Sequence, residues 1–163
     1  MKFKVRIRNL FGAIKASIGS IIVASLIILI LIVVIKLEIV DNSLISSLFL
    51  GVCSSIVSTL LLMFIDKYHN SVRTFKEIID LSILFMNEIS IASKEYLYND
   101  YIIYYSKYTN ICTLSSKLYY KKDYRKISES LSKILKSIYE CENERNIDAN
   151  INEARELLGE YLK

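Results

Sequence analysis

The sequence predicts an all-α membrane protein, with an N-terminal hairpin of two transmembrane helices followed by a cytoplasmic antiparallel bundle of three to four helices. Three observations predict this fold class. Two long runs in the N-terminal part carry no charged side chain, and the polar remainder repeats its apolar residues at the period of an α-helix. The 163 residues include no proline and only four glycines, so the turn residues that a sheet needs are missing.

The first apolar run covers residues 18–35 and defines the first predicted transmembrane helix. With the uncharged residues before it, the run reaches about 20 residues, enough to cross a hydrocarbon core of about 30 Å. The second run, residues 42–65, follows after a linker of six residues, 36–41, predicted to be extracytoplasmic. Two spans joined so closely predict a helical hairpin in the membrane.

Residues 1–17 are basic, with five cationic side chains and no acidic one. Those side chains are Lys2, Lys4, Arg6, Arg8 and Lys15. One helical face of the segment is apolar, and it consists of Phe3, Ile7, Leu10, Phe11 and Ile14. This pattern predicts an amphipathic helix on anionic headgroups, which Lys2, Lys4, Arg6 and Arg8 would contact. The alternation from residue 2 to residue 8 also fits a short strand.

A cleaved signal peptide is the alternative interpretation of this N-terminus. Its apolar region would be 7–15 residues long and would end at a small-residue cleavage site, whereas this run is longer and ends in Val34, Ile35 and Lys36. We therefore expect an uncleaved anchor. Because the bases precede the first span and follow the second, the positive-inside rule predicts a bacterial inner-membrane protein with both termini in the cytoplasm.

Small residues recur every four positions along a stripe that leads into the first predicted span and along another within the second. These residues are Gly12, Ala16, Ser20 and Ala24 in the first stripe, and Ser47, Gly51, Ser55 and Thr59 in the second. Small side chains at this spacing let helix backbones approach closely, so the stripes predict packing within the hairpin or an oligomer. An aqueous path lined by the hydroxyl groups is the alternative. Neither span has an ionisable side chain, which argues against a coupled transporter.

The tail, residues 66–163, shows helical periodicity from Ser71 onward, and a polar stretch, residues 141–146, interrupts it. Its first apolar stripe begins at Phe75 and ends at Ile89, and the pattern is compatible both with a separate helix and with one that continues from the second span. Asn99 and Asp100 predict a helix break, and a tyrosine-rich helical face follows it. We take the tyrosines as core and interface residues.

Two further helices are predicted in the C-terminal part. Asp123 is expected to cap the first, and Asn146 or Asp148 the second. Their apolar faces are Ile127, Leu131, Ile134, Leu135 and Ile138 in the first, and Ile147, Ile151, Ala154, Leu157, Leu158 and Tyr161 in the second.

The charges of these two helices are opposite. Residues 117–136 hold seven bases and two acids, and residues 140–163 hold three bases and seven acids. We expect the two segments to attract each other. Lipid headgroups or a protein partner are the expected contacts of the basic residues Lys117, Lys121, Lys122, Arg125 and Lys126. No nucleic-acid-binding motif accompanies these bases, so nucleic acid is not an expected partner.

The motifs of catalysis, phosphate binding and metal coordination are missing from the sequence. His69 is the single histidine, and Cys53, Cys112 and Cys141 have no metal-ligand spacing, so we interpret the cysteines as reduced apolar fillers. We therefore expect no enzymatic activity, no cofactor and no metal.

The function predicted from these features is protein–protein interaction or oligomeric assembly by the cytoplasmic helical domain of a two-span membrane protein. In outline, this plan of hairpin and tail resembles that of small two-span holins and of two-span effectors in bacterial antiphage systems. The resemblance covers the plan of the chain only. It implies the alternative function, that of an oligomeric pore-forming or membrane-disrupting effector.

Overall fold

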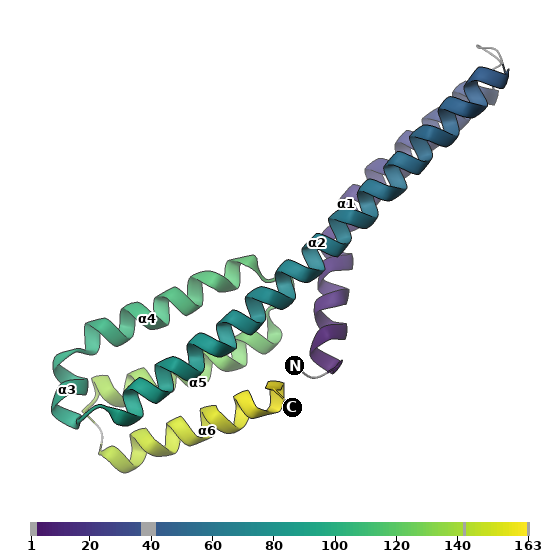
Figure 1. The fold of residues 1–163 in the computed structure, drawn as a ribbon. Coiled ribbons are helices and arrows are strands. Elements are labelled where there is room, and N and C mark those ends of the chain that lie inside the picture. The colour runs from purple at the N-terminus through teal and green to yellow at the C-terminus, as the bar shows by residue number, and fades with distance from the viewer. Residues whose placement is uncertain (1–2, 37–41, 142, 163) are drawn as a thin grey trace. The chain divides into compact units, whose positions relative to one another are not determined.

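The computed structural model describes residues 3–36, 42–141 and 143–162. Every regular element in these ranges is a helix, which confirms the predicted all-helical character (Figure 1). The elements are α1 (Phe3–Lys36), α2 (Asn42–Ile91), α3 (Lys94–Asn99), α4 (Tyr101–Leu114), the short 3-10 helix η1 (Ser115–Lys117), α5 (Lys122–Tyr139) and α6 (Glu144–Leu162). Lys2 and residues 37–41 of the predicted linker lie outside the described ranges.

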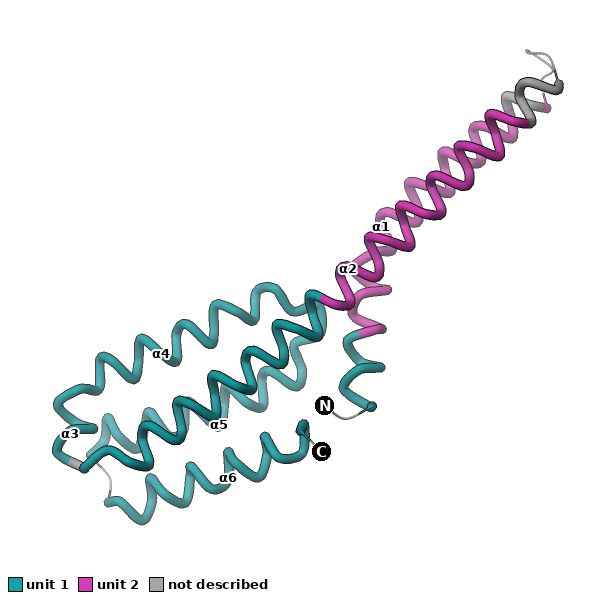
Figure 2. Tube along the Cα trace, in the orientation of Figure 1, with its two compact units in different colours: residues 1–9, 70–163 teal, residues 10–69 magenta. Residues whose placement is uncertain are grey.

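The chain divides into two compact units (Figure 2). Residues 1–9 and 70–163 form the first unit, which we call the helical domain, and residues 10–69 form the second, which we call the two-helix unit. The first nine residues therefore belong to the same unit as the C-terminal part of the chain.

The helix α1 is continuous over 34 residues, so the basic N-terminal segment and the first apolar run share one helix. The short strand that the alternating charges also allowed does not form. An isolated strand would leave its backbone groups without partners, whereas a helix pairs them within the segment.

The helix α2 is also continuous, over 50 residues from the second apolar run to Ile91. Its sequence has no proline and a single glycine, Gly51, so no residue in its interior ends the helix. The backbone leaves the helix at Ala92 and Ser93, and Ser93 has the extended conformation typical of the residue before a helix.

In the two-helix unit, α1 and α2 lie side by side (Figure 1). Four small residues of α1 are buried in this unit, namely Gly12, Ala13, Ser17 and Ala24. The Lys67 ammonium of α2 donates to the Ala16 carbonyl at 3.0 Å and to Ser17 Oγ at 3.4 Å. Both helices are long and apolar enough to cross a membrane, and the apolar windows of α1 and α2 are 11% and 0% buried.

In the helical domain, α4, α5 and α6 lie alongside the second half of α2 (Figure 1). Aromatic side chains join these helices edge to face. The rings of Phe75 on α2 and Tyr161 on α6 are 5.7 Å apart, and those of Phe85 on α2 and Tyr104 on α4 are 6.4 Å apart. The core therefore draws side chains from every long helix of the domain, including Val5 of α1.

The apolar faces predicted for α5 and α6 are confirmed, except that Leu157 is half-buried at the edge of the core. The two helices also carry the predicted charge complementarity, because Lys133 Nζ lies 2.9 Å from Glu153 Oε1. Asn150 Nδ2 donates to Ser137 Oγ at 2.7 Å and adds a polar link between the same helices.

Two predicted helix caps are wrong. The helix α5 begins at Lys122, and Asp123 lies inside its first turn rather than before it. The helix α6 begins at Glu144, and the capping side chain is Asn143, whose Oδ1 accepts from the Asn146 amide at 3.0 Å. By contrast, the predicted break at Asp100 is confirmed, because α3 ends and α4 begins there.

The prediction that Cys141 is an apolar filler is also wrong. Cys141 is exposed in the connection between α5 and α6 and adopts a positive φ of 52°, so it is not an apolar filler on a helix. Cys53 and Cys112 are half-buried, and all three cysteines are free.

We name the two ends of the helical domain, because the candidate sites lie there. At the first, which we call the terminal end, Ser71 Oγ donates to Asn9 Oδ1 at 2.8 Å, so the two points where the chain passes into the two-helix unit are adjacent. At the second, which we call the α3 end, the rings of Tyr101 and Tyr139 lie 5.5 Å apart.

Candidate functional site

An ion pair at the terminal end attaches the start of α1 to the start of α5. Arg8 Nη1 lies 3.0 Å from Asp123 Oδ1, and the Arg8 guanidinium stands 5.8 Å from the centre of the Tyr120 ring. The Asp123 side chain is 3% exposed and the Arg8 side chain 28%. Arg8 Nε and Asp123 Oδ2 are buried without a well-formed hydrogen bond, although the Tyr161 hydroxyl lies beside the carboxylate.

Burial dominates the electrostatics of this cluster. Removal from water raises the pKa of the Asp123 carboxyl above its ordinary value, although the charges of Arg8, Lys126 and Lys122 act in the opposite direction. Burial also raises the pKa of Tyr161 to about 12, and the adjacent Asp123 carboxylate contributes to this shift. The ion pair therefore offsets the cost of desolvating Asp123 only in part.

Asn9 supports the same attachment. It is 2% exposed, its side-chain amide donates to the Val5 carbonyl at 3.1 Å, and its oxygen accepts from Ser71. Sequence reasoning did not identify Asn9, Ser71 or the partner of Asp123. A signal was present, because Asp123 lies four residues before Ile127 and so falls on the buried face of α5.

Lys2 lies outside the described residues, and the other basic residues expected to contact anionic lipid or a partner are exposed, except Arg8. Arg8 is half-buried by its contact with Asp123. Lys126 lines a surface groove with Glu156 and Glu160 of α6, so its charge has acidic neighbours. Arg6 is exposed on another face of α1.

The remaining bases define a surface that we call the basic rim. It consists of Lys4, Lys117, Lys121, Lys122 and Arg125. Lys4 lies one helical turn before Arg8 and so shares its face of α1, while the other four flank the start of α5. In the described part of the chain, no ion pair joins any of these five side chains to an acid.

The small-residue stripes lie partly together in the two-helix unit. Side chains from both line one open groove with a volume of about 590 Å³. The predicted packing residues on this groove are Ala16, Ser20, Ala24, Ser55 and Thr59. Gly51 also faces open space, because a methyl group built on its Cα would meet nothing within 4 Å. Ser47, like Gly51, is exposed, and Gly12 is buried.

The α3 end carries a concentration of exposed apolar side chains. Ile91 is 84% exposed at the end of α2, Ile102 is 79% exposed on α4, and Tyr96 and Ile103 are also exposed. Ile91, Tyr96 and Ile103 line a groove of about 440 Å³ with Tyr104 and the ion-paired Glu88 and Lys107. We call Ile91, Tyr96, Ile102 and Ile103 the α3-end patch.

Among the described residues, no group of three or more His, Cys, Asp or Glu side chains is placed to hold a metal ion. Comparisons with protein-family models, with curated proteins and with solved structures returned no match. The structure by itself therefore defines the class of the protein, which is an all-helical chain with two helices long and apolar enough to cross a membrane.

Proposed function

We propose that this chain is a two-span protein of the bacterial inner membrane, whose helical domain is an antiparallel helical bundle in the cytoplasm that mediates protein–protein interaction or oligomeric assembly, without catalytic activity. The observation that carries the interaction function is the α3-end patch. Apolar side chains scattered singly on a surface are ordinary, but a group of large ones around a groove is typical of a surface that a partner covers.

The contact between Lys67 and Ala16 supports the membrane hairpin. It sets the start of the charge-free part of α1 beside the end of the charge-free part of α2. The two apolar stretches therefore begin at a common level, as two spans of one membrane would. Because a 50-residue helix is about 75 Å long and a hydrocarbon core takes about 30 Å of it, α2 is long enough to continue into the cytoplasm.

The open groove between α1 and α2 supports assembly in the membrane. Lipid tails are as apolar as leucine side chains, so helices in a membrane associate through close packing and hydrogen bonds between them. Small and hydroxyl side chains from both stripes offer that packing to another helix, and a single chain leaves the groove open.

Amine cross-linking of the full chain in native membranes tests this function. We expect cross-linked species above the monomer, reduced at least threefold by Ile102→Ser. Leu162→Ser is the matched control, because it removes an exposed apolar side chain outside the α3-end patch. A strictly monomeric chain, or equal cross-linking in both variants, would contradict the interaction function. Recovery of the chain in a detergent-free supernatant would contradict the membrane hairpin.

A pore-forming effector is the second candidate, and the hydroxyl groups of Ser20, Ser55 and Thr59 on the groove favour it. Induction of the chain while the membrane potential is followed separates the two functions. The assembly function predicts a stable potential. A rapid depolarisation that Ser55→Leu/Thr59→Leu abolishes would favour the pore instead.

A further inference from the structure

The terminal end of the helical domain brings together two basic segments that are more than 100 residues apart in the sequence. The Arg8–Asp123 ion pair holds the start of α1 against the start of α5. Lys4 is thereby placed at the same end as Lys121 and Lys122, which flank Asp123 in the chain. The bases of the rim therefore come together only in the folded chain.

The charges of the rim are available to a ligand, in contrast to those farther along α5. Lys133 pairs with Glu153, and Lys136 lies 3.7 Å from Glu140 one turn later. The rim bases, in contrast, make no ion pair with an acid of α6 in the described part of the chain, and the one acid among them, Asp123, is buried and paired with Arg8. A surface with five bases and no paired acid attracts a polyanion.

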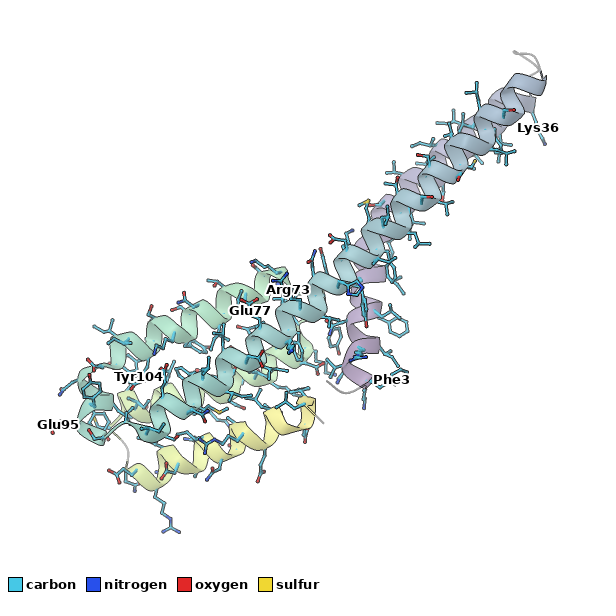
Figure 3. The ribbon with its side chains drawn as sticks, in the orientation of Figure 1. Phe3, Lys36, Arg73, Glu77, Glu95 and Tyr104 are labelled. Carbon is cyan, nitrogen blue, oxygen red and sulfur yellow. The ribbon has the colours of Figure 1, made fainter. Side chains whose placement is uncertain are left out.

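Exposed aromatic side chains accompany the rim. Phe3 is 78% exposed at the start of α1, one residue before Lys4 (Figure 3), and Tyr119 is 44% exposed between Lys117 and Lys121. Bases beside exposed aromatic rings suit the boundary of a bilayer, where the ammonium groups meet phosphates and the rings lie at headgroup depth. In a nucleic-acid surface, the aromatic side chains would instead form a platform on which bases stack.

We propose that the basic rim is a binding surface for anionic phospholipid headgroups at the inner face of the membrane. The proposal rests on the proposed function in one respect, that α1 and α2 cross the bilayer. The chain leaves the helical domain for the apolar parts of both helices at the end that carries the rim, beside the Asn9–Ser71 contact. The rim then selects anionic over zwitterionic lipid in the leaflet that it touches.

Brominated lipids, which quench tryptophan fluorescence, test this selection in the intact chain. The sequence has no tryptophan, so Tyr119→Trp supplies a single reporter beside the rim. The full chain is reconstituted in vesicles of phosphatidylcholine and phosphatidylglycerol at a fixed ratio, with bromine on one lipid or on the other. Because both leaflets have the same composition, the direction of insertion does not affect the result.

We expect brominated phosphatidylglycerol to quench the reporter at least twofold more than its mole fraction predicts. When Lys117→Gln/Lys121→Gln is added to the reporter variant, quenching by brominated phosphatidylglycerol should fall to the value that its mole fraction predicts. The matched pair Lys133→Gln/Lys136→Gln should leave the excess quenching unchanged. The excess also disappears in 0.5 M salt, where charges at a surface are screened within a few ångströms.

A second reporter, Leu29→Trp, separates failure of this proposal from failure of the proposed function. Leu29 is exposed in the apolar part of α1, so both brominated lipids should quench it in proportion to their mole fractions. No quenching of that reporter would overturn the membrane span and the lipid surface together. Normal quenching there, with no excess of phosphatidylglycerol at Tyr119→Trp, overturns the lipid surface alone. Displacement of the excess by a single-stranded RNA at equal phosphate concentration also overturns it and assigns the rim to nucleic acid.

Discussion

Replacing one partner of the Arg8–Asp123 ion pair should destabilise the helical domain more than replacing both. Arg8→Met leaves the Asp123 carboxylate 3% exposed and without its counter-charge. Breaking a fully buried pair costs about 3–5 kcal/mol. Arg8 is itself 28% exposed, so water already weakens the interaction, and we expect a loss near the lower end, about 3 kcal/mol in the free energy of unfolding. Asp123→Leu leaves a guanidinium that can turn toward water, and it should cost about 1–2 kcal/mol.

The double variant Arg8→Met/Asp123→Leu should be nearly as stable as the parent, within about 1 kcal/mol, because two apolar side chains pay no desolvation cost. The coupling between the two sites is then about 3 kcal/mol or more. Urea titration of the full chain in a non-ionic detergent measures it, with Tyr119→Trp as the fluorescent reporter of the helical domain. The parent for this cycle is the reporter variant itself.

Simple addition of the two single losses in the double variant would refute the reasoning, because it would mean that the two charges do not interact. A loss below about 0.5 kcal/mol for Arg8→Met would refute it as well, because it would mean that water reaches Asp123 despite its burial. Arg6→Met is the matched control. Arg6 is an exposed base on the same helix and belongs to none of the ion pairs described above, so its replacement should change stability by less than about 0.5 kcal/mol.

Three further predictions concern the same domain. Ile134→Ala, at a side chain with no exposed surface, should cost about 2–5 kcal/mol in urea titration, while the exposed Ile102→Ala should cost less than about 0.5 kcal/mol. Folding raises the pKa of Asp123, so the folded state binds the carboxyl proton more tightly than the unfolded state does. The stability of the chain relative to Asp123→Asn should therefore rise as pH falls from neutral through the raised pKa toward about 3.9, the ordinary pKa of an aspartate. A constant difference in stability across that range would contradict this. Because the pKa of Tyr161 is about 12 in the folded chain, the protonated side chain contributes fully to stability below about pH 10, the pKa of an unperturbed tyrosine. That contribution is lost as pH rises toward 12. The free energy of unfolding relative to Tyr161→Phe should therefore fall by about 2–3 kcal/mol across that window.

The features predicted correctly are those that local sequence specifies. The apolar faces of α5 and α6 follow from a period of 3.6 residues, and the break at Asp100 follows from two adjacent residues that favour caps. The apolar length of both long helices follows from charge-free runs. None of these features depends on which segment a residue meets in the fold.

The features that sequence reasoning missed have two causes, a long-range contact and a choice among equivalent capping residues. Local rules assign Asp123 to a cap, but Arg8, 115 residues away in the sequence, holds it inside α5 instead. The cap of α6 was misplaced because Asn143, Asn146 and Asp148 are all suitable capping residues, and propensity alone does not choose among them. The position of Asp123 therefore depends on a contact between helices, whereas the cap of α6 is a local hydrogen bond that spans three residues.

The fold also sorts the positive charge of residues 117–136 into two groups with different roles. Packing of α6 on α5 brings Lys126 and Lys133 beside acidic residues, and these contacts form on the surface between the two helices. The bases of the rim face no such acid and stay available to an external anion. Salt should therefore affect the stability of the helical domain less than it affects lipid binding by the rim. Exposed pairs such as Lys133–Glu153 contribute about 0–1 kcal/mol each, so the stability of the domain should change little between low and high salt, while the lipid excess at Tyr119→Trp should vanish.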